Sequence, residues 1–275
     1  MVFMPRTHQE PRRSHRRTFF LPDQRKVHKA GLPWDHTYSM KQNFVPKDPA
    51  LNKKLGIAQG EEVLVIAGCY GNFANEIARG VRGAVVHYTD LSRSMVEGVR
   101  REKRDISSYR ARDALLIPRK PNQYHWSFSF EPLQLQNRSF PIFLVRSLLN
   151  RKGAIVVWGK ELNNAHHMKK VAEIYGALFE TKEEQIEGDY QTFPRKHPDE
   201  RLVVNRLLTT AEARRKAHQD LRVLQLVDRT SHIDLNALGK KLNITKEQII
   251  ESLERLSNIS TMLYSDVLTQ RSVKN

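Results

Sequence analysis

A short apolar run that enters a turn of small residues is the feature that most constrains the fold of this chain. Residues 62–67 read Glu-Val-Leu-Val-Ile-Ala, which is the length of one buried strand. The turn at residues 68–72 opens into a segment in which Phe73 and Ile77 lie one helical turn apart and which Gly80 closes. The pattern predicts a strand, a tight turn and a helix, the unit that presents backbone N–H groups and a positive helix end to a ligand.

A second apolar run, residues 84–88, leads to an acidic residue, Asp90. In a doubly wound sheet the carboxyl ends of neighbouring strands face the same crevice. We therefore expect the Asp90 carboxylate to lie beside the turn at residues 68–72. A carboxylate at this place accepts hydrogen bonds from the hydroxyl groups of a ribose.

The two segments together resemble the first two motifs of the class I S-adenosylmethionine-dependent methyltransferases. Those motifs read roughly V-L-D-I-G-C-G-x-G-x-x-A and D-L-S-x-x-M, and Asp90-Leu91-Ser92 with Met95 matches the second. The resemblance implies an α/β fold with a doubly wound, mostly parallel seven-stranded sheet, and it implies S-adenosylmethionine as the cofactor. The cofactor-binding residues that it implies in this part of the chain are Ala67, Gly68, Cys69, Gly71, Asn72, Phe73, Asp90 and Leu91.

The first motif departs from the family pattern. The acid of the family falls on Val65, and two of its glycines fall on Ala67 and Cys69, while Gly71 keeps its place and Gly68 is displaced by one. Alanine and cysteine allow the backbone to approach a cofactor if neither position needs a positive φ. The loss of the acid removes an anchor for the methionine end of the cofactor. A sheet that keeps the fold and has lost the cofactor is therefore an open alternative.

Three later segments extend the resemblance over roughly residues 45–208. Asp113-Ala114, after a predicted strand near residues 108–112, matches the acid and small residue that contact the adenine in the family. Residues 148–158 resemble the L-L-K-P-G-G-x-L-V-I segment before the fifth strand. Two strands predicted near residues 178–187 and 201–207 suit the antiparallel end of such a sheet.

The fourth predicted strand, residues 125–130, ends at Glu131-Pro132, where the substrate loop of these enzymes lies. Amino-group methyltransferases of nucleic acids usually carry N/D-P-P-Y/F there, and only Pro132 fits this pattern. Glu131 is a candidate for holding a substrate group, with a solvated loop residue as the equal alternative. The sequence singles out no general base, so the catalytic residues stay unassigned.

A shorter resemblance lies upstream. Residues 41–45, Lys-Gln-Asn-Phe-Val, resemble the G-Q-N-F-L that opens the ribosomal RNA adenine dimethyltransferases, with Lys41 in place of the glycine. The resemblance adds Gln42 to the candidate substrate residues. It favours RNA as the methyl acceptor without indicating a target atom.

The charge balance also favours RNA. The chain carries 46 Lys and Arg against 30 Asp and Glu, a formal net charge of +16. Residues 1–32, rich in Pro, Arg and His and without periodicity, are predicted to form an irregular basic arm. A polyanionic partner, most simply RNA, is the natural interpretation, and a merely solvated tail is the alternative. The first 30 residues hold two acids and eight basic residues, a net +6: Arg6, Arg12, Arg13, Arg16, Arg17, Arg25, Lys26 and Lys29.

Residues 209–275 are predicted to form a second, smaller domain after a methyltransferase-like domain at residues 33–208. Asp234 is placed to cap a helix over residues 235–242, and Thr245 to Gln248 read as a capping box before an apolar run. Two short helices joined by a tight turn are typical of a helix-turn-helix, and Ile259 to Tyr264 are expected to form a wing.

The second helix of this pair is a poor reader of a DNA groove. Once its apolar face is buried, Glu247, Glu251 and Glu254 remain outside, and acids repel phosphates. We therefore expect this domain to dock on protein, as in a homodimer, rather than to bind DNA. A winged-helix transcription regulator is the weaker alternative.

Several classes are disfavoured by the sequence. No run of about 18 apolar residues predicts a membrane span, and the N-terminal residues lack the apolar core of a secretory signal, so we expect a cytoplasmic protein that makes no contact with membranes. The single cysteine excludes an internal disulfide, and no spacing predicts a metal site. The leading hypothesis is an S-adenosylmethionine-dependent methyltransferase, and the main rival is a degenerate relative that binds RNA or ribosomes.

Overall fold

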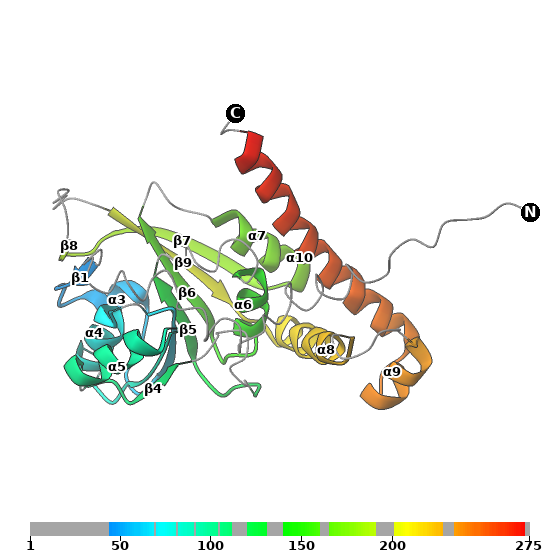
Figure 1. The fold of residues 1–275 in the computed structure, drawn as a ribbon, viewed down its shortest axis with the longest axis horizontal. Coiled ribbons are helices and arrows are strands. Elements are labelled where there is room, and N and C mark those ends of the chain that lie inside the picture. The colour runs from blue at the N-terminus through cyan, green and yellow to red at the C-terminus, as the bar shows by residue number, and fades with distance from the viewer. Residues whose placement is uncertain are drawn as a thin grey trace, which may run out of the picture.

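A computed structural model provides the structure of the chain (Figure 1). It describes residues 44–68, 70–80, 82–90, 92–103, 105–111, 120–130, 140–159, 165–190, 201–227 and 234–272. Within these ranges, every helix is too short or too polar to cross a membrane.

A seven-stranded sheet forms the centre of the molecule, with the strand order β4-β3-β2-β5-β6-β9-β7. Strand β9 runs antiparallel to both of its neighbours, β6 and β7, and the other pairings are parallel. The predicted doubly wound, mostly parallel seven-stranded sheet is confirmed. The strands are β2 Glu62–Ile66, β3 Val85–Asp90, β4 Ser108–Ala111, β5 Trp126–Phe130, β6 Gly153–Gly159, β7 Leu178–Gln185 and β9 Arg201–Leu208.

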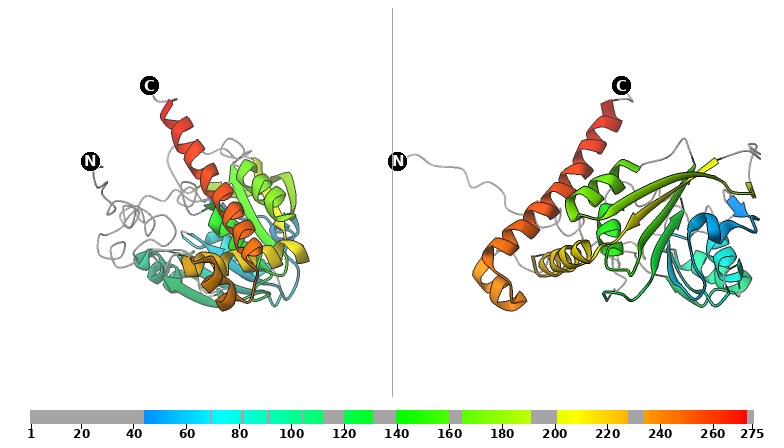
Figure 2. Two further views of the ribbon diagram at one scale, coloured as in Figure 1. Left: turned by 90° about the vertical axis from the view of Figure 1, so that its right-hand side faces the viewer. Right: turned by 180° about the vertical axis from the view of Figure 1, so that it is seen from behind.

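Helices cover both faces of this sheet (Figures 1 and 2). Alternate residues of strand β2 pack against the two sides. Val63 and Val65 of β2 pack toward the cluster that includes α3, α4 and α5. Leu64 and Ile66 pack toward the cluster that includes α6, α7 and α8. Because successive side chains of a strand point to opposite faces, the apolar run 63–66 fits a strand buried on both sides. The helices are α3 Leu51–Leu55, α4 Asn72–Gly80, α5 Arg93–Glu102, α6 Phe140–Ser147, α7 Ala165–Tyr175 and α8 Ala211–Val227.

The strand order places a topological switch point between β2 and β5. From β2 the chain moves outward to β3 and β4 and then returns to pair β5 with the other edge of β2. In open α/β sheets, ligands bind beyond the carboxyl ends of the strands at such a point. The edge of β2 and β5 is therefore the first place to look for a site.

A separate two-stranded sheet joins the start of the described chain to the end of β7. Strand β1 (Phe44–Pro46) pairs antiparallel with β8 (Gly188–Tyr190). Asp48 fixes this connection, because its carboxylate accepts hydrogen bonds from the backbone N–H groups of Ala50 at 2.8 Å and Glu187 at 3.3 Å. The N-cap of α3 is Ala50 and not Asp48, since the Asp48 side chain reaches back to the turn. The helix ends at Gly56, which adopts a left-handed φ of 76°.

The C-terminal helices are α8, α9 (Leu235–Leu242) and α10 (Lys246–Ser272). The predicted capping box is present: the Gln248 N–H donates to Thr245 Oγ1 at 3.2 Å, and the Thr245 N–H donates to Gln248 Oε1 at 2.9 Å. The predicted wing is wrong, because Ile259 to Tyr264 continue α10 as helix. No glycine or proline interrupts residues 246–272, and Ile259 is fully buried in the cluster of α6 and α7.

A buried polar network ties these helices to the sheet domain. Asp220 of α8 accepts hydrogen bonds from Tyr175 Oη of α7 at 2.8 Å and from Arg255 of α10 at 2.8 and 3.0 Å. Burial and the neighbouring carboxylate raise the pKa of Tyr175 well above its ordinary value of 10.0, so the hydroxyl keeps its proton. Ala213 and Ala217 of α8 also belong to the cluster of α6 and α7. The first half of α8 therefore packs as part of the sheet domain, and a boundary at residue 208 stays a prediction.

Candidate cofactor site

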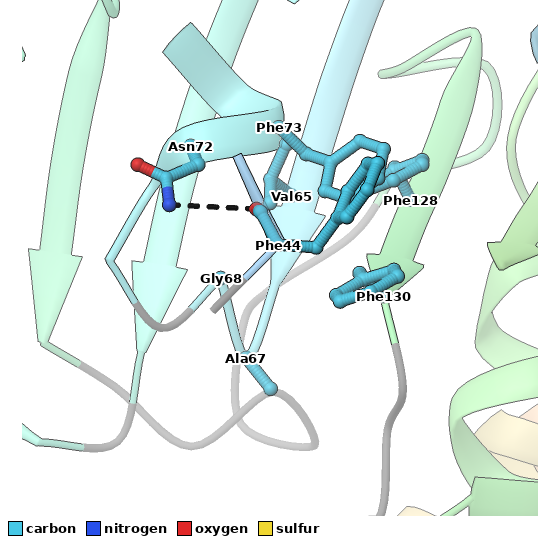
Figure 3. Close-up of a pocket in the computed structure, with 8 residues that line it drawn as sticks. All are labelled: Phe44, Val65, Ala67, Gly68, Asn72, Phe73, Phe128 and Phe130. Carbon is cyan, nitrogen blue, oxygen red and sulfur yellow. Dashed lines mark hydrogen bonds between the residues drawn. The ribbon is translucent and has the colours of Figure 1, made fainter. Parts of the chain in front are cut away.

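A pocket lies at the switch point between β2 and β5 (Figure 3). Its enclosed space is about 20 Å³, which is enough for one water molecule. A nucleoside-sized ligand therefore requires side chains of the pocket to move. The residues that line the pocket are Phe44, Val65, Ala67, Gly68, Asn72, Phe73, Phe128 and Phe130.

The turn after β2 brings the backbone of Gly68 and Gly71 to the edge of the sheet. A Cβ on Gly68 would lie 2.4 Å from Tyr88 Cε2, and one on Gly71, where φ is 68°, would lie 2.6 Å from Val99 Cγ1. Both glycines are thus required by packing and backbone geometry, whatever they bind. Ala67 adopts a positive φ of 51°. Alanine replaces the family's glycine without strain only at a negative φ, so the backbone at Ala67 is strained.

Asp90 stands beside this turn at the carboxyl end of β3. Its side chain is buried, with 4% of the residue exposed, and Oδ1 accepts the Ser92 N–H at 2.9 Å. Thr89 Oγ1 donates to the carbonyl oxygen of Val65 at 2.9 Å and so fixes the end of β3 against β2. The sequence-based expectation that Asp90 and the turn share one edge is met, because β2 and β3 pair in parallel register.

Ser92 connects the same edge to α5. Its hydroxyl accepts the N–H of Met95 at 3.1 Å and forms the N-cap of the helix. The D-L-S-x-x-M match therefore has a local structural meaning: the acid ends the strand, the serine caps the next helix, and Met95 packs inward at 5% exposure.

Four phenylalanine rings form the other side of the pocket. The ring centroid of Phe73 lies 4.6 Å from that of Phe130 and 5.3 Å from that of Phe128. The ring of Phe44 lies 5.9 Å from that of Phe73 and 6.2 Å from that of Phe130 (Figure 3). Phe128 and Phe130 were missed as site residues. Their alternation along β5 was the available signal, since it places both side chains on one face.

Asn72 is the polar side chain among those that line the pocket. It opens α4, is 8% exposed, and its Nδ2 donates to the carbonyl oxygen of Phe44 at 3.5 Å (Figure 3). Val65, at the position of the family's acid, is 1% exposed and lines the same pocket. The side of the pocket that lacks the acid thus holds one amide and the positive end of α4.

The remaining candidates lie outside the described residues, and two groups of them are near pocket residues in the sequence. Gln42 precedes Phe44 by two residues, and Glu131-Pro132 follows Phe130 directly. The contact between the Phe44 and Phe130 rings shows that the two chain segments meet at this pocket. The candidates of which the structure says nothing are Gln42, Cys69, Leu91, Asp113, Ala114, Glu131 and Pro132.

The residues at the pocket offer different partners to the two halves of S-adenosylmethionine. Asp90 suits the adenosine half, because a buried carboxylate accepts hydrogen bonds from ribose hydroxyls. At the methionine half of the cofactor, Asn72 and the first turn of α4 are present in place of a carboxylate. The residues present therefore fit the cofactor, with the weaker fit at its methionine end.

No family model matches the sequence, and none of the curated proteins matches it. Solved structures with a similar fold include an S-adenosylmethionine-dependent methyltransferase from Aquifex aeolicus, with 13% identity and a TM-score of 0.43, over 68% of this chain and 99% of that one. A TehB-like methyltransferase from Corynebacterium glutamicum has 14% identity and a TM-score of 0.43, over 68% and 100% of the two chains. Phosphoethanolamine N-methyltransferase 2 from Haemonchus contortus, solved with S-adenosylmethionine, has 15% identity and a TM-score of 0.45, over 72% and 60%.

Proposed function

We propose that this protein binds S-adenosylmethionine at the edge of β2, β3 and β5 and transfers its methyl group to an acceptor. The observation that supports the proposal most is the convergence of Asp90, the Gly68–Gly71 turn and the pocket at one switch point. Asp90 is assigned to the ribose hydroxyls, and Asn72 with the first turn of α4 to the methionine end.

The work of the protein in this reaction is positioning. The cofactor supplies an electrophilic methyl group when it is bound. The phenylalanine rings exclude water from the pocket, and the two ends of the site hold the donor in one orientation toward the acceptor. Because no side chain of the described residues at the pocket is a titratable base, the acceptor is expected to react without deprotonation by a residue that lines it.

Calorimetry with S-adenosylhomocysteine tests the proposal directly. We expect micromolar binding, equivalent to about −7 to −8 kcal/mol. The absence of a binding signal at millimolar ligand would contradict it. In that case the loss of the acid at Val65, which is the one observation that favours the rival, would make the chain a methyltransferase-fold protein that works without the cofactor.

We propose RNA as the acceptor class, on the basis of the basic arm and the Gln42-Asn43-Phe44 segment. Deletion of residues 1–32 is expected to weaken RNA binding at least tenfold near 0.1 M salt and to reduce the salt dependence, because fewer counterions are released. Fluorescence anisotropy with a labelled RNA measures both quantities. An arm of equal length with its eight basic residues replaced by Gln is the control that separates charge from length. An unchanged affinity after deletion would remove the arm from the binding surface.

A further inference from the structure

The outer face of α8 is a stripe of basic side chains. Arg215, His218 and Arg222 are exposed and lie three or four residues apart, on the side of the helix opposite to Ala213, Ala217 and Asp220, which are buried. A surface helix commonly pairs its charges along such a face. On this stripe the charges are positive, and Glu212, three residues before Arg215, is the exposed acid beside it.

Three hydrogen bonds connect the two ends of the stripe to neighbouring basic residues. Arg214 Nη2 donates to the carbonyl oxygens of Asn150 at 3.2 Å and Arg151 at 3.0 Å, which places the exposed Arg151 beside the first turns of α8. At the other end, Arg222 Nη2 donates to the carbonyl oxygen of Leu242 at 3.3 Å, which places the last turn of α9 beside Arg222. That turn carries two exposed lysines. We call the resulting surface the basic band: Arg151, Arg215, His218, Arg222, Lys240 and Lys241.

The two acids of α8 offset little of the charge of this band, although Glu212 also lies near enough to Arg215 to interact with it electrostatically. Asp220 is fully buried and paired with Arg255. Glu212 pairs with Lys216 of the same helix at 2.6 Å. By contrast, α10 exposes Glu247, Glu251 and Glu254, as the sequence predicted. These three acids thus lie on a different helix from Arg215 and Arg222.

We infer that the basic band binds the phosphate backbone of RNA. The inference rests on the proposed RNA acceptor and adds a second surface to the N-terminal arm. Arginine presents a planar fork of N–H donors that suits phosphate oxygens, and three of the six side chains of the band are arginines. Backbone contacts of this kind fix a nucleic acid in place and carry no sequence preference.

The band lies at the end of the sheet opposite to the pocket. Helix α8 follows the end of β9, and Leu208 of β9 pairs with Gly153, the first residue of β6 (Figure 1). Strand β6 has 7 residues and spans roughly 23 Å. The band therefore holds RNA about that far from the acceptor base, as an anchor and not as a base-reading surface.

The test compares two doubly substituted full-length proteins that lose the same charge. The first is Arg215→Gln with Arg222→Gln on the band. The second, the matched control, is Lys53→Gln with Arg101→Gln, two exposed basic residues on α3 and α5. Both are titrated by fluorescence anisotropy against two labelled 20-nucleotide single-stranded RNAs of different sequence, at several salt concentrations and without cofactor.

We expect the band variant to bind both RNAs about tenfold more weakly near 0.1 M salt, with a salt slope smaller by about 1.4, since each lost phosphate contact removes about 0.7. The control should stay within threefold of the unsubstituted protein. Equal affinities for the two variants would overturn the inference, and so would an unsubstituted protein that binds neither RNA. A loss confined to one RNA sequence would also overturn it, because backbone contacts do not distinguish sequences.

The single variant Arg215→Gln guards against a structural effect. Arg222 contacts α9, and its loss could loosen that helix, whereas no hydrogen bond or ion pair of Arg215 is found within the described part of the chain. We expect the single variant to keep the melting temperature of the unsubstituted protein. Its salt slope should fall by about half as much as that of the double variant. An unchanged slope in a folded single variant would contradict the inference. Since this titration contains no cofactor, a failure of S-adenosylhomocysteine binding is seen separately, by calorimetry.

Discussion

The two sides of the pocket differ in chemistry. The β3 side carries the buried Asp90 carboxylate, fixed to Ser92 and aligned by the bond from Thr89 to Val65. The β5 side is a group of phenylalanine rings, with Asn72 as its polar neighbour. The pocket therefore has a polar side at the end of β3, which we propose for the ribose, and an apolar side at the end of β5.

The largest effect is expected for the aromatic side. Phe73 is 5% exposed and contacts the rings of Phe44, Phe128 and Phe130. Phe73→Ala should lower the free energy of unfolding by about 3–5 kcal/mol, because it leaves a cavity in the core. Urea unfolding measures the change, and Phe73→Leu, which keeps most of the volume, is the control.

The same variant sharpens the comparison between the two sides. If the rings only pack the core, folded Phe73→Ala protein keeps its affinity for S-adenosylhomocysteine. A clear loss of affinity in folded protein would show that the aromatic side also contacts the cofactor, so that the division into a binding side and a packing side is wrong.

A smaller effect, on binding, is expected for the polar side. Asp90→Ala should weaken S-adenosylhomocysteine binding by about 1–3 kcal/mol, since charge-assisted hydrogen bonds to the ribose are lost. Calorimetry measures the change. Asp105→Ala, which removes an exposed acid that pairs with Arg79 at 3.2 Å, is the control and should bind as the unsubstituted protein does. Equal affinities for the two variants would leave Asp90 with a purely structural role.

The smallest effect is expected at Ala67, where the two sides meet. A left-handed conformation costs an L-residue about 1–2 kcal/mol, and glycine costs about 0.5–1 kcal/mol in the unfolded chain. Ala67→Gly should therefore raise the free energy of unfolding by about 0.5 kcal/mol. The control is Ala78→Gly within helix α4, where glycine should lower the free energy of unfolding by about 1 kcal/mol. A destabilising Ala67→Gly would mean that the alanine methyl group contributes more by packing than its backbone costs.

Much of the fold could be predicted from the chain alone because its signals are local. The alternation of Val63 to Ile66, the capping serine at Ser92 and the left-handed glycine at Gly56 each depend on near neighbours in sequence. The likeness of two motifs in register then implied a doubly wound, mostly parallel seven-stranded sheet, while its strand order came from the structure. The turn at Gly68 and Gly71 and the carboxylate of Asp90 lie at one edge, as expected, because parallel neighbouring strands end together; their role in binding stays a prediction.

Other features depend on residues that are distant in the sequence, and only the tertiary structure decided them. Phe128 and Phe130 reach Phe73 because β5 returns to pair with β2, a contact between segments more than 50 residues apart. The segment predicted as a wing is helical, because Ile259 packs in the core cluster with residues of α6 and α7. The basic band exists because Ala213, Ala217 and Asp220 face that core and turn Arg215 and Arg222 outward. Local patterns fixed which segments form helices and strands, whereas burial, which depends on the whole fold, decided which of their side chains face a ligand, a neighbour or solvent.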